Sequence, residues 1–177
     1  MKILNIHGFM GESDNKNFSA LCEIYGMDKI ISPQTDYIAE SPSEISEKFE
    51  KLVCGADEEL YFVGQSLGCW FADRLSRKMS VPCVLTNPCY FPHELDIISG
   101  SDIPREFLEY YRENSPAEKN PLAVTVCSDH DTVIPGNYGN CERLSAEVIS
   151  IYGDHSITDG LAGHLRNAFE IIGNLKK

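Results

Sequence analysis

The sequence predicts an α/β domain built as a three-layer sandwich, with about six parallel strands between two layers of helices. Three observations predict it. Six short, mostly apolar runs recur along the 177 residues, helical patterns of ten or more residues separate most of them, and several runs are followed directly by chemically reactive residues. This alternation is typical of a parallel sheet covered on both faces. No linker or composition shift divides the chain, so we expect a single domain over residues 1–177.

The predicted strands are continuous apolar runs, as expected where helices cover both faces of a sheet. They span Lys2 to Ile6, Lys29 to Ser32, Leu60 to Val63, Pro82 to Thr86, Leu122 to Cys127 and Glu147 to Tyr152.

Three helices have clear signatures. Ser41, Pro42 and Glu44 form a capping box with proline at the first helical position, so a helix begins there. A second helix follows Ser66, and a third lies near the C-terminal end of the sequence. Their apolar faces are formed by Ile45, Phe49, Leu52 and Val53, by Leu67, Phe71 and Leu75, and by Leu161, Leu165, Ala168, Phe169 and Ile172.

Residues 89–121 interrupt the alternation, with several prolines and two short helix-like stretches, Glu94 to Ile98 and Arg105 to Glu113. The segment is too long for a plain connection, so we interpret it as a helical cap over the site. Its aromatic side chains could line an acyl pocket, although an insertion must also bury such residues merely to stay ordered. The candidate pocket residues are Met10, Gln65, Tyr90, Phe91, Phe107 and Tyr110.

The sequence Gly64-Gln65-Ser66-Leu67-Gly68 lies where a predicted strand gives way to a helix. A serine on a sharp strand-to-helix turn is the nucleophile elbow of serine hydrolases, and glycines on either side let the backbone turn tightly. The five-residue pattern is weak by itself, so its context must support it.

A serine nucleophile needs a histidine base and an acid that orients the histidine. Two aspartates, Asp129 and Asp131, follow the fifth predicted strand, and His155 follows the sixth. We favour Asp131 as the acid, with Asp129 capping the turn, because Asp131 begins an Asp-x-Val-Ile-Pro stretch that resembles a hydrolase acid loop. We favour His155 over His164, which lies inside the last helix.

An oxyanion hole needs two backbone donors. The N–H of Leu67 lies at the start of the elbow helix, and the loop after the first strand, which begins His7-Gly8-Phe9, offers the N–H of Phe9. We therefore expect Phe9 and Leu67 to supply them. His7 then has a structural role, holding its loop by hydrogen bonds.

These motifs together resemble the small bacterial α/β-hydrolase esterases of the YqiA type, over nearly the whole chain. The resemblance rests on His7-Gly8-Phe9, the elbow at Ser66, Asn87-Pro88, Asp131 and Gly153-Asp154-His155. It implies a shortened, minimal α/β-hydrolase fold and carboxylester hydrolysis. One departure is Cys69, which stands where such elbows often carry a second glycine.

Other functions remain open. An acyl thioesterase would use the same triad, and a non-catalytic domain of this fold could bind an acyl ligand or a protein. A metal-dependent hydrolase would use residues of the last two strand ends or of the cap, although no closed-site spacing supports it. Its ligands would be Asp129, His130, Asp131 and His155, or Cys89 with His93. We also weigh Cys69 as a nucleophile and reject it as buried.

Composition narrows the partners. The net charge of −12 leaves no basic stripe, so we expect neither a nucleic acid nor a membrane partner. The expected partner is a small-molecule substrate, a small or medium acyl ester, and we expect no cofactor. Seven cysteines, odd in number and without a C-x-x-C pair, are typical of free thiols in a reducing cytoplasm. The first apolar stretch is far too short for a signal peptide, which fits the same location.

Overall fold

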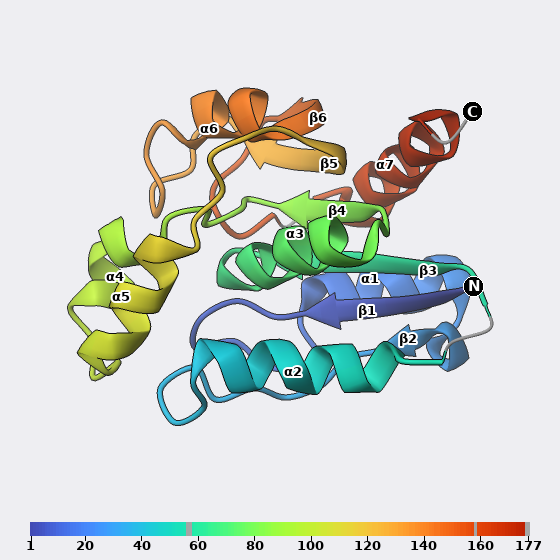
Figure 1. Ribbon diagram of the computed structural model, residues 1–177. Helices are drawn as coiled ribbons and strands as arrows, with labels where there is room; N and C mark the ends of the chain where they lie inside the picture. Colours follow the sequence, from blue (N-terminus) through green and yellow to red (C-terminus); the bar gives the residue numbers. More distant parts are fainter. Residues whose placement is uncertain (56–57, 158, 176–177) are drawn as a thin grey trace.

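Six strands form one parallel sheet in the computed structural model, which describes residues 1–55, 58–157 and 159–175 (Figure 1). The order across the sheet is β2-β1-β3-β4-β5-β6, and every neighbouring pair is parallel. The predicted fold class is confirmed. The strands are β1 (Lys2–Ile6), β2 (Ile30–Ile31), β3 (Leu60–Gln65), β4 (Cys83–Thr86), β5 (Asn120–Ser128) and β6 (Ser145–Ile151).

The strand order reverses beside β1. From β1 the chain moves outward to β2, and it then returns to the other side of β1 for β3 and the remaining strands. The carboxyl ends of β1 and β3 are adjacent, because Ile6 pairs with Gly64. In open parallel sheets, ligands bind outside the carboxyl ends at such a reversal. The loops after β1 and β3 are therefore the expected walls of a site.

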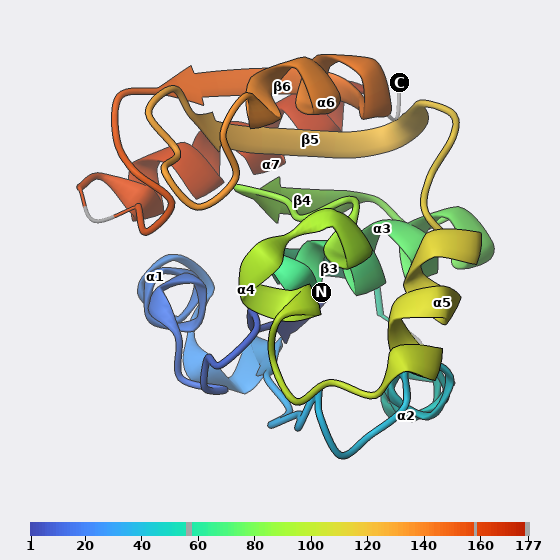
Figure 2. The ribbon, with the colours of Figure 1, turned by 90° about the vertical axis from the view of Figure 1, so that its left-hand side faces the viewer.

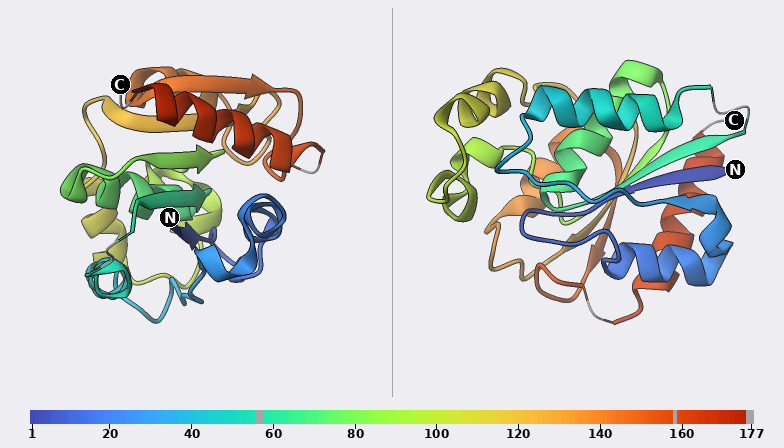
Figure 3. Two further views of the ribbon diagram at one scale, coloured as in Figure 1. Left: turned by 90° about the vertical axis from the view of Figure 1, so that its right-hand side faces the viewer. Right: turned by 90° about the horizontal axis from the view of Figure 1, so that it is seen from below.

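Helices cover both faces of the sheet (Figure 1, Figure 3). Two helices, α1 and α7, pack on one face through one hydrophobic cluster, whereas α2, α3 and α6 pack on the other through a second cluster. The helices are α1 (Lys16–Tyr25), α2 (Pro42–Val53), α3 (Leu67–Met79), α4 (Asp96–Ser99), α5 (Arg105–Glu113), α6 (Asn137–Leu144) and α7 (Leu161–Leu175), with 3-10 turns at Met27–Lys29 and Pro92–Glu94.

Local sequence explains where several elements begin. The Ser41 side chain accepts a hydrogen bond from the Glu44 N–H while the Glu44 carboxylate accepts one from the Ser41 N–H, so the predicted capping box opens α2. Other elements differ from the prediction. The second strand shrinks to two residues behind a 3-10 turn, and the stretch from Glu94 to Ile98 is split between a 3-10 turn and α4.

The predicted cap segment lies beyond the carboxyl ends of the strands (Figure 2). It is packed into the protein rather than resting on its surface. Tyr111 of α5 is fully buried, with its ring centroid 4.9 Å from that of Trp70 in α3, and Ile98 and Ile103 are also buried. These side chains belong to the same hydrophobic cluster as Leu4 and Ile6 of β1 and Phe62 of β3.

Two further findings concern the environment of the chain. Within residues 1–55, 58–157 and 159–175, no helix combines the length and apolar character that a bilayer-spanning segment requires. The seven cysteines are all unpaired, and five of them are buried.

Candidate functional site

Ser66 occupies a strained turn between β3 and α3. Its backbone angles are φ 50° and ψ −118°, in a left-handed region that few non-glycine residues adopt. Two glycines make this turn sterically possible. A Cβ at Gly64 would lie 2.6 Å from the Cα of Cys69, and a Cβ at Gly68 would lie 2.2 Å from the carbonyl oxygen of Ile6. The chain therefore forms the tight strand-to-helix turn that the sequence predicts.

Asn17 of α1 supports this turn through hydrogen bonds, a role that the sequence prediction did not include. Its buried amide donates hydrogen bonds to Thr86 Oγ1 at 3.0 Å and to the Gly64 carbonyl at 3.3 Å. The spacing of Asn17 with Ala20 and Leu21 places this polar side chain on the buried face of α1, and that signal could have found it. A polar group buried in this way needs partners, and here they are the elbow backbone and its neighbouring strand.

Asp131 and His155 are in direct contact. His155 Nδ1 lies 2.8 Å from Asp131 Oδ2, with only 2% of the aspartate side chain and 16% of the histidine side chain exposed. The other carboxylate oxygen accepts the backbone N–H groups of Val133 and Ile134 at 3.0 and 2.8 Å. A histidine that donates through Nδ1 presents Nε2 as an acceptor.

The competing residues lie elsewhere. Asp129 is exposed and accepts hydrogen bonds from His130 and from the Gly153 N–H, and the bond from His130 lowers the pKa of its carboxyl. His164 lies in the first turn of α7, where its N–H donates to the carbonyl of Gly160. The structure thus brings together Asp131 and His155, and not Asp129 or His164.

Ser66 and His155 reach the same edge of the sheet without a hydrogen bond between them. In the described part of the chain, neither Ser66 Oγ nor His155 Nε2 has a hydrogen-bond partner. Hydrogen bonds between catalytic groups are often long in a protein without substrate, and they shorten when substrate binds.

Asp154 connects the two loops that carry Asp131 and His155. One of its oxygens accepts the Thr132 N–H at 2.9 Å, the Thr132 hydroxyl at 2.7 Å and the His155 N–H at 2.7 Å. These bonds, led by the Thr132 N–H, lower the pKa of Asp154 to about 2. The carboxylate therefore shapes the turn, as expected from its place beside His155.

The loop after β1 lies against the serine. A Cβ at Gly8 would fall 3.1 Å from Ser66 Cβ, so only a residue without a side chain fits easily. Phe9 follows directly, and its N–H has no hydrogen-bond partner among the described residues. Leu67 is the first residue of α3, so its N–H is one of those that the helix leaves unbonded.

His7 fixes this loop from inside the protein. Its Nδ1–H donates to the Gly8 carbonyl at 2.8 Å, and its Nε2 accepts the Thr35 N–H at 3.0 Å. Tyr37 donates its hydroxyl proton to the His7 carbonyl, and the two rings pack edge to face. Burial lowers the pKa of His7, which keeps the imidazole neutral. The side chain thus holds the loop, as the sequence analysis expects.

Two small cavities lie beside segments that contact the elbow, the loop after β1 and the segment after β4. Phe9 and Met10, together with Tyr37, line a cavity of about 280 Å³ near the loop after β1, and Met10 itself is 80% exposed. Tyr90 and Phe91 line another of about 200 Å³. Its remaining lining residues are Cys89, Glu94, Leu95, Ile134, Pro135, Asn137 and Asn140.

Three of the predicted pocket residues make contacts in the core or beside α3. The hydroxyl of Tyr90 points into the core, 2.8 Å from Ser145 Oγ, so the residue is anchored in the sheet. Tyr110 lies beside Arg74, more than two helical turns beyond Ser66, and Phe107 packs against the main core cluster. The helical pattern of α5 does not show which side of α3 this helix packs against, so the sequence could not place Phe107 and Tyr110. Gln65, the last residue of β3, is half-buried.

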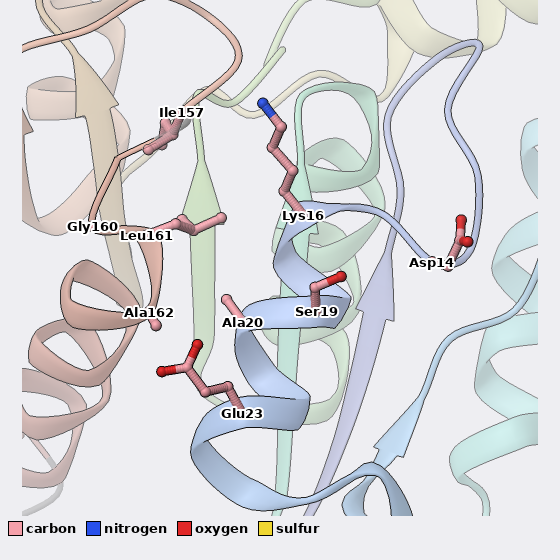
Figure 4. Close-up of a pocket in the computed structure, with 9 residues that line it drawn as sticks. All are labelled: Asp14, Lys16, Ser19, Ala20, Glu23, Ile157, Gly160, Leu161 and Ala162. Atoms are coloured by element: carbon pink, nitrogen blue, oxygen red, sulfur yellow. The ribbon is translucent and has the colours of Figure 1, made fainter.

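Another cavity, of about 610 Å³, lies between α1 and α7 (Figure 4). None of the residues predicted for the site lines it. Lys16, at its rim, donates a hydrogen bond to Ser156 Oγ at 2.8 Å, in the loop that carries His155. The lining residues are Asp14, Lys16, Ser19, Ala20, Glu23, Ile157, Gly160, Leu161 and Ala162.

Metal ligands do not gather in the part of the chain that the structure describes: there, no three His, Cys, Asp or Glu side chains are close enough to hold an ion together. Cys69 is fully buried, its thiol donates to the Thr86 carbonyl, and burial raises its pKa well above the usual value. The thiol is therefore directed toward β4 in the core.

Comparison with solved structures shows what the fold resembles. Mouse alpha/beta hydrolase domain-containing protein 10 is similar with a TM-score of 0.69 at 17% identity, over 98% of this chain and 90% of that one. A putative hydrolase of the alpha/beta superfamily from Xanthomonas campestris pv. campestris gives 0.66 at 19% identity, covering 98% and 99%. Paleococcus ferrophilus monoacylglycerol lipase gives 0.68 at 13% identity, covering 97% and 93%. The fold is therefore that of the α/β-hydrolases.

Comparison of sequences gives the family. No curated protein matches the chain. The model of an uncharacterised protein family, UPF0227, matches residues 2–131, which include the elbow and Asp131. The match confirms the resemblance to small α/β-hydrolases of the YqiA type, and the chain belongs to the UPF0227 family.

Proposed function

We propose that the protein is a serine hydrolase that cleaves small or medium acyl esters through an acyl-enzyme intermediate. One observation carries the proposal: the hydrogen-bonded pair of Asp131 and His155 lies at the same sheet edge as Ser66 on its strained turn. Serine, acid and histidine follow β3, β5 and β6 in that order. This is the chain order of the α/β-hydrolase triad.

In the first half of the reaction, Ser66 Oγ attacks the carbonyl carbon of the ester while His155 Nε2 takes the hydroxyl proton. Asp131 keeps Nδ1–H in place and stabilises the imidazolium that forms. The N–H groups of Phe9 and Leu67 bind the oxyanion, and Leu67 gains from the positive end of α3. The tetrahedral intermediate then expels the alcohol, which receives its proton from His155.

In the second half, water attacks the acyl group on Ser66 and gives its proton to His155. Collapse of this intermediate releases the carboxylic acid and returns the proton to the serine oxygen. The cycle needs no cofactor, because the three side chains supply nucleophile, base and orientation.

The volumes of the two small cavities, one lined by Phe9 and Met10 and the other by Phe91, indicate the size of substrate to expect. At about 200 and 280 Å³, they are smaller than the pockets of roughly 300–1,000 Å³ that hold drug-sized ligands. Phe9, Met10 and Phe91 would contact the acyl or alcohol part of a small ester. Thioesters react through the same steps, so the assay panel includes them.

The test uses a fluorophosphonate probe together with p-nitrophenyl esters and acyl thioesters of increasing acyl length. We expect the wild-type protein to be labelled and to hydrolyse the short esters, and Ser66→Ala to lose both properties. The matched control is Ser80→Ala, because Ser80 also has a positive φ, of 56°, but ends α3 away from the sheet edge. Equal labelling of the wild-type protein and Ser66→Ala would overturn the proposal.

A further inference from the structure

Asn87 occupies an unusual position at the end of β4. Its backbone φ is 44°, in the left-handed region that asparagine tolerates better than most residues. Its side chain is 1% exposed, and its N–H continues the sheet by donating to the Val126 carbonyl at 2.9 Å. A strained and buried polar residue persists only where its surroundings fix it, so the contacts of Asn87 must hold this conformation.

Every polar atom of the Asn87 side chain is engaged. The Oδ1 atom accepts the Ser128 N–H at 2.7 Å, while Nδ2 donates to Ser128 Oγ at 2.9 Å, to the His155 carbonyl at 2.7 Å and to the Asp154 carbonyl at 3.3 Å. The orientation of the amide is unambiguous, because a backbone N–H can only donate and the two carbonyls can only accept.

These contacts join the three segments that carry the proposed triad. On one side, Thr86, which precedes Asn87, accepts the Ser66 N–H at 3.0 Å. On the other side, the Asn87 amide bonds to Ser128, three residues before Asp131, and to the backbone of His155. Asp131 orients the imidazole ring, whereas Asn87 fixes the backbone from which the ring projects.

We infer that Asn87 is a positioning residue that sets the distance between His155 and Ser66. The inference rests on the proposed serine hydrolase function and assigns to Asn87 no contact with substrate. A displacement of about 1 Å in a reacting group can cost on the order of 100-fold in rate. Loss of the amide should therefore lower kcat more than it changes KM.

The experiment compares Asn87→Gly and Asn87→Asp with a matched control, Asn120→Ala. Glycine suits the positive φ but removes the amide, and aspartate keeps the shape but turns an oxygen toward two carbonyls. Asn120 is equally buried, and its Nδ2 donates to Asp73 and Ser76 at the opposite edge of the sheet. The wild-type protein and the three variants are first checked for cooperative thermal unfolding.

We expect both Asn87 variants to lose about 10- to 100-fold in kcat with KM changed less than about threefold, whereas folded Asn120→Ala keeps the wild-type kcat. A second readout is independent of any substrate. In ¹⁵N-histidine-labelled protein, the Nδ1–H signal of His155, assigned by its loss in His155→Gln, should shift or exchange faster in the Asn87 variants only.

Wild-type kcat together with an unchanged His155 signal in Asn87→Gly would overturn the inference. An equal fall of kcat in Asn120→Ala would also overturn it, because a general loss of packing would then be the cause. If the wild-type protein hydrolyses no ester, the proposed function fails, and the His155 signal alone decides whether Asn87 positions the histidine.

Discussion

Gly68 lies directly against Ile6, so that a Cβ at position 68 would fall 2.2 Å from the Ile6 carbonyl oxygen and 2.5 Å from that of His7. Both atoms belong to the backbone, so no side-chain rearrangement can relieve such a contact. The close approach connects the elbow helix with the loop that carries Phe9. The stability of the fold and the geometry of the proposed site thus depend on the same glycine.

Substitution Gly68→Ala should therefore separate α3 from the end of β1 and destabilise the protein by about 3 kcal/mol, the upper end of the usual cost of overpacking. The measurement is the free energy of unfolding in urea. Gly163→Ala is the control, because its Cβ would meet no atom within 4 Å on α7. Alanine there should stabilise the helix by about 0.5–1 kcal/mol. Equal effects of the two substitutions would contradict this explanation.

Asp131→Asn and Asp129→Asn should differ sharply in ester hydrolysis. An amide in place of the Asp131 carboxylate would no longer hold His155 in the required tautomer, and we expect kcat to fall by about 10,000-fold. Asp129→Asn, on an exposed side chain that does not touch His155, should change kcat by less than about threefold. A larger loss in Asp129→Asn would show that the acid has been assigned to the wrong residue.

Burial of His7 should make stability depend on pH. Its folded-state pKa is lowered by desolvation, so in mildly acidic solution the unfolded chain binds a proton that the folded protein does not. This contribution is present above the unfolded value of about 6.5 and is lost as pH falls through the folded pKa. Urea unfolding between about pH 7.5 and 5.5 should show a steeper loss in the wild-type protein than in His7→Gln. Equal slopes in the two proteins would contradict this explanation.

Thiol reagents should distinguish Cys69 from the exposed cysteines. Burial raises the pKa of Cys69 well above its usual value, and that of Cys89 to about 12, so neither is a ready thiolate. A disulfide reagent should label exposed Cys54 first and half-buried Cys22 more slowly, with ester hydrolysis unaffected. Cys69→Ala should likewise remain active. Inactivation that follows labelling of Cys69 would point to a thiol nucleophile.

Much of the fold could be predicted because local signals were strong. The apolar run of β1 and the boundaries of α5 (Arg105–Glu113) agree with the sequence prediction, and the capping box at Ser41 marks the start of α2. The second strand was predicted too long, because an edge strand that pairs only with β1 needs few residues. The sequence prediction did not single out α1 or α6. For α1 the reason is that a polar residue, Asn17, lies on its buried face and interrupts the apolar pattern.

The positions of the three proposed triad residues could be predicted further than their surroundings. Ser66, Asp131 and His155 each follow a strand, and in a parallel sheet that is sufficient to bring them to one edge. Tertiary contacts decide the rest. The sequence does not show that the Tyr90 hydroxyl is hydrogen-bonded to Ser145 or that Tyr110 lies beside Arg74, because each contact depends on a partner far away in the chain.

The segment over the strand ends is held in place, because its side chains Tyr111, Ile98 and Ile103 are buried in the main core. Lifting it would expose these side chains, at a cost of roughly 1.5–3 kcal/mol for each one. Substrate would therefore enter through an opening beside the exposed side chain of Met10, while this segment stays in place. Selectivity would then follow from the width of that opening, so that changes at Met10 should alter which esters are accepted without altering the chemistry.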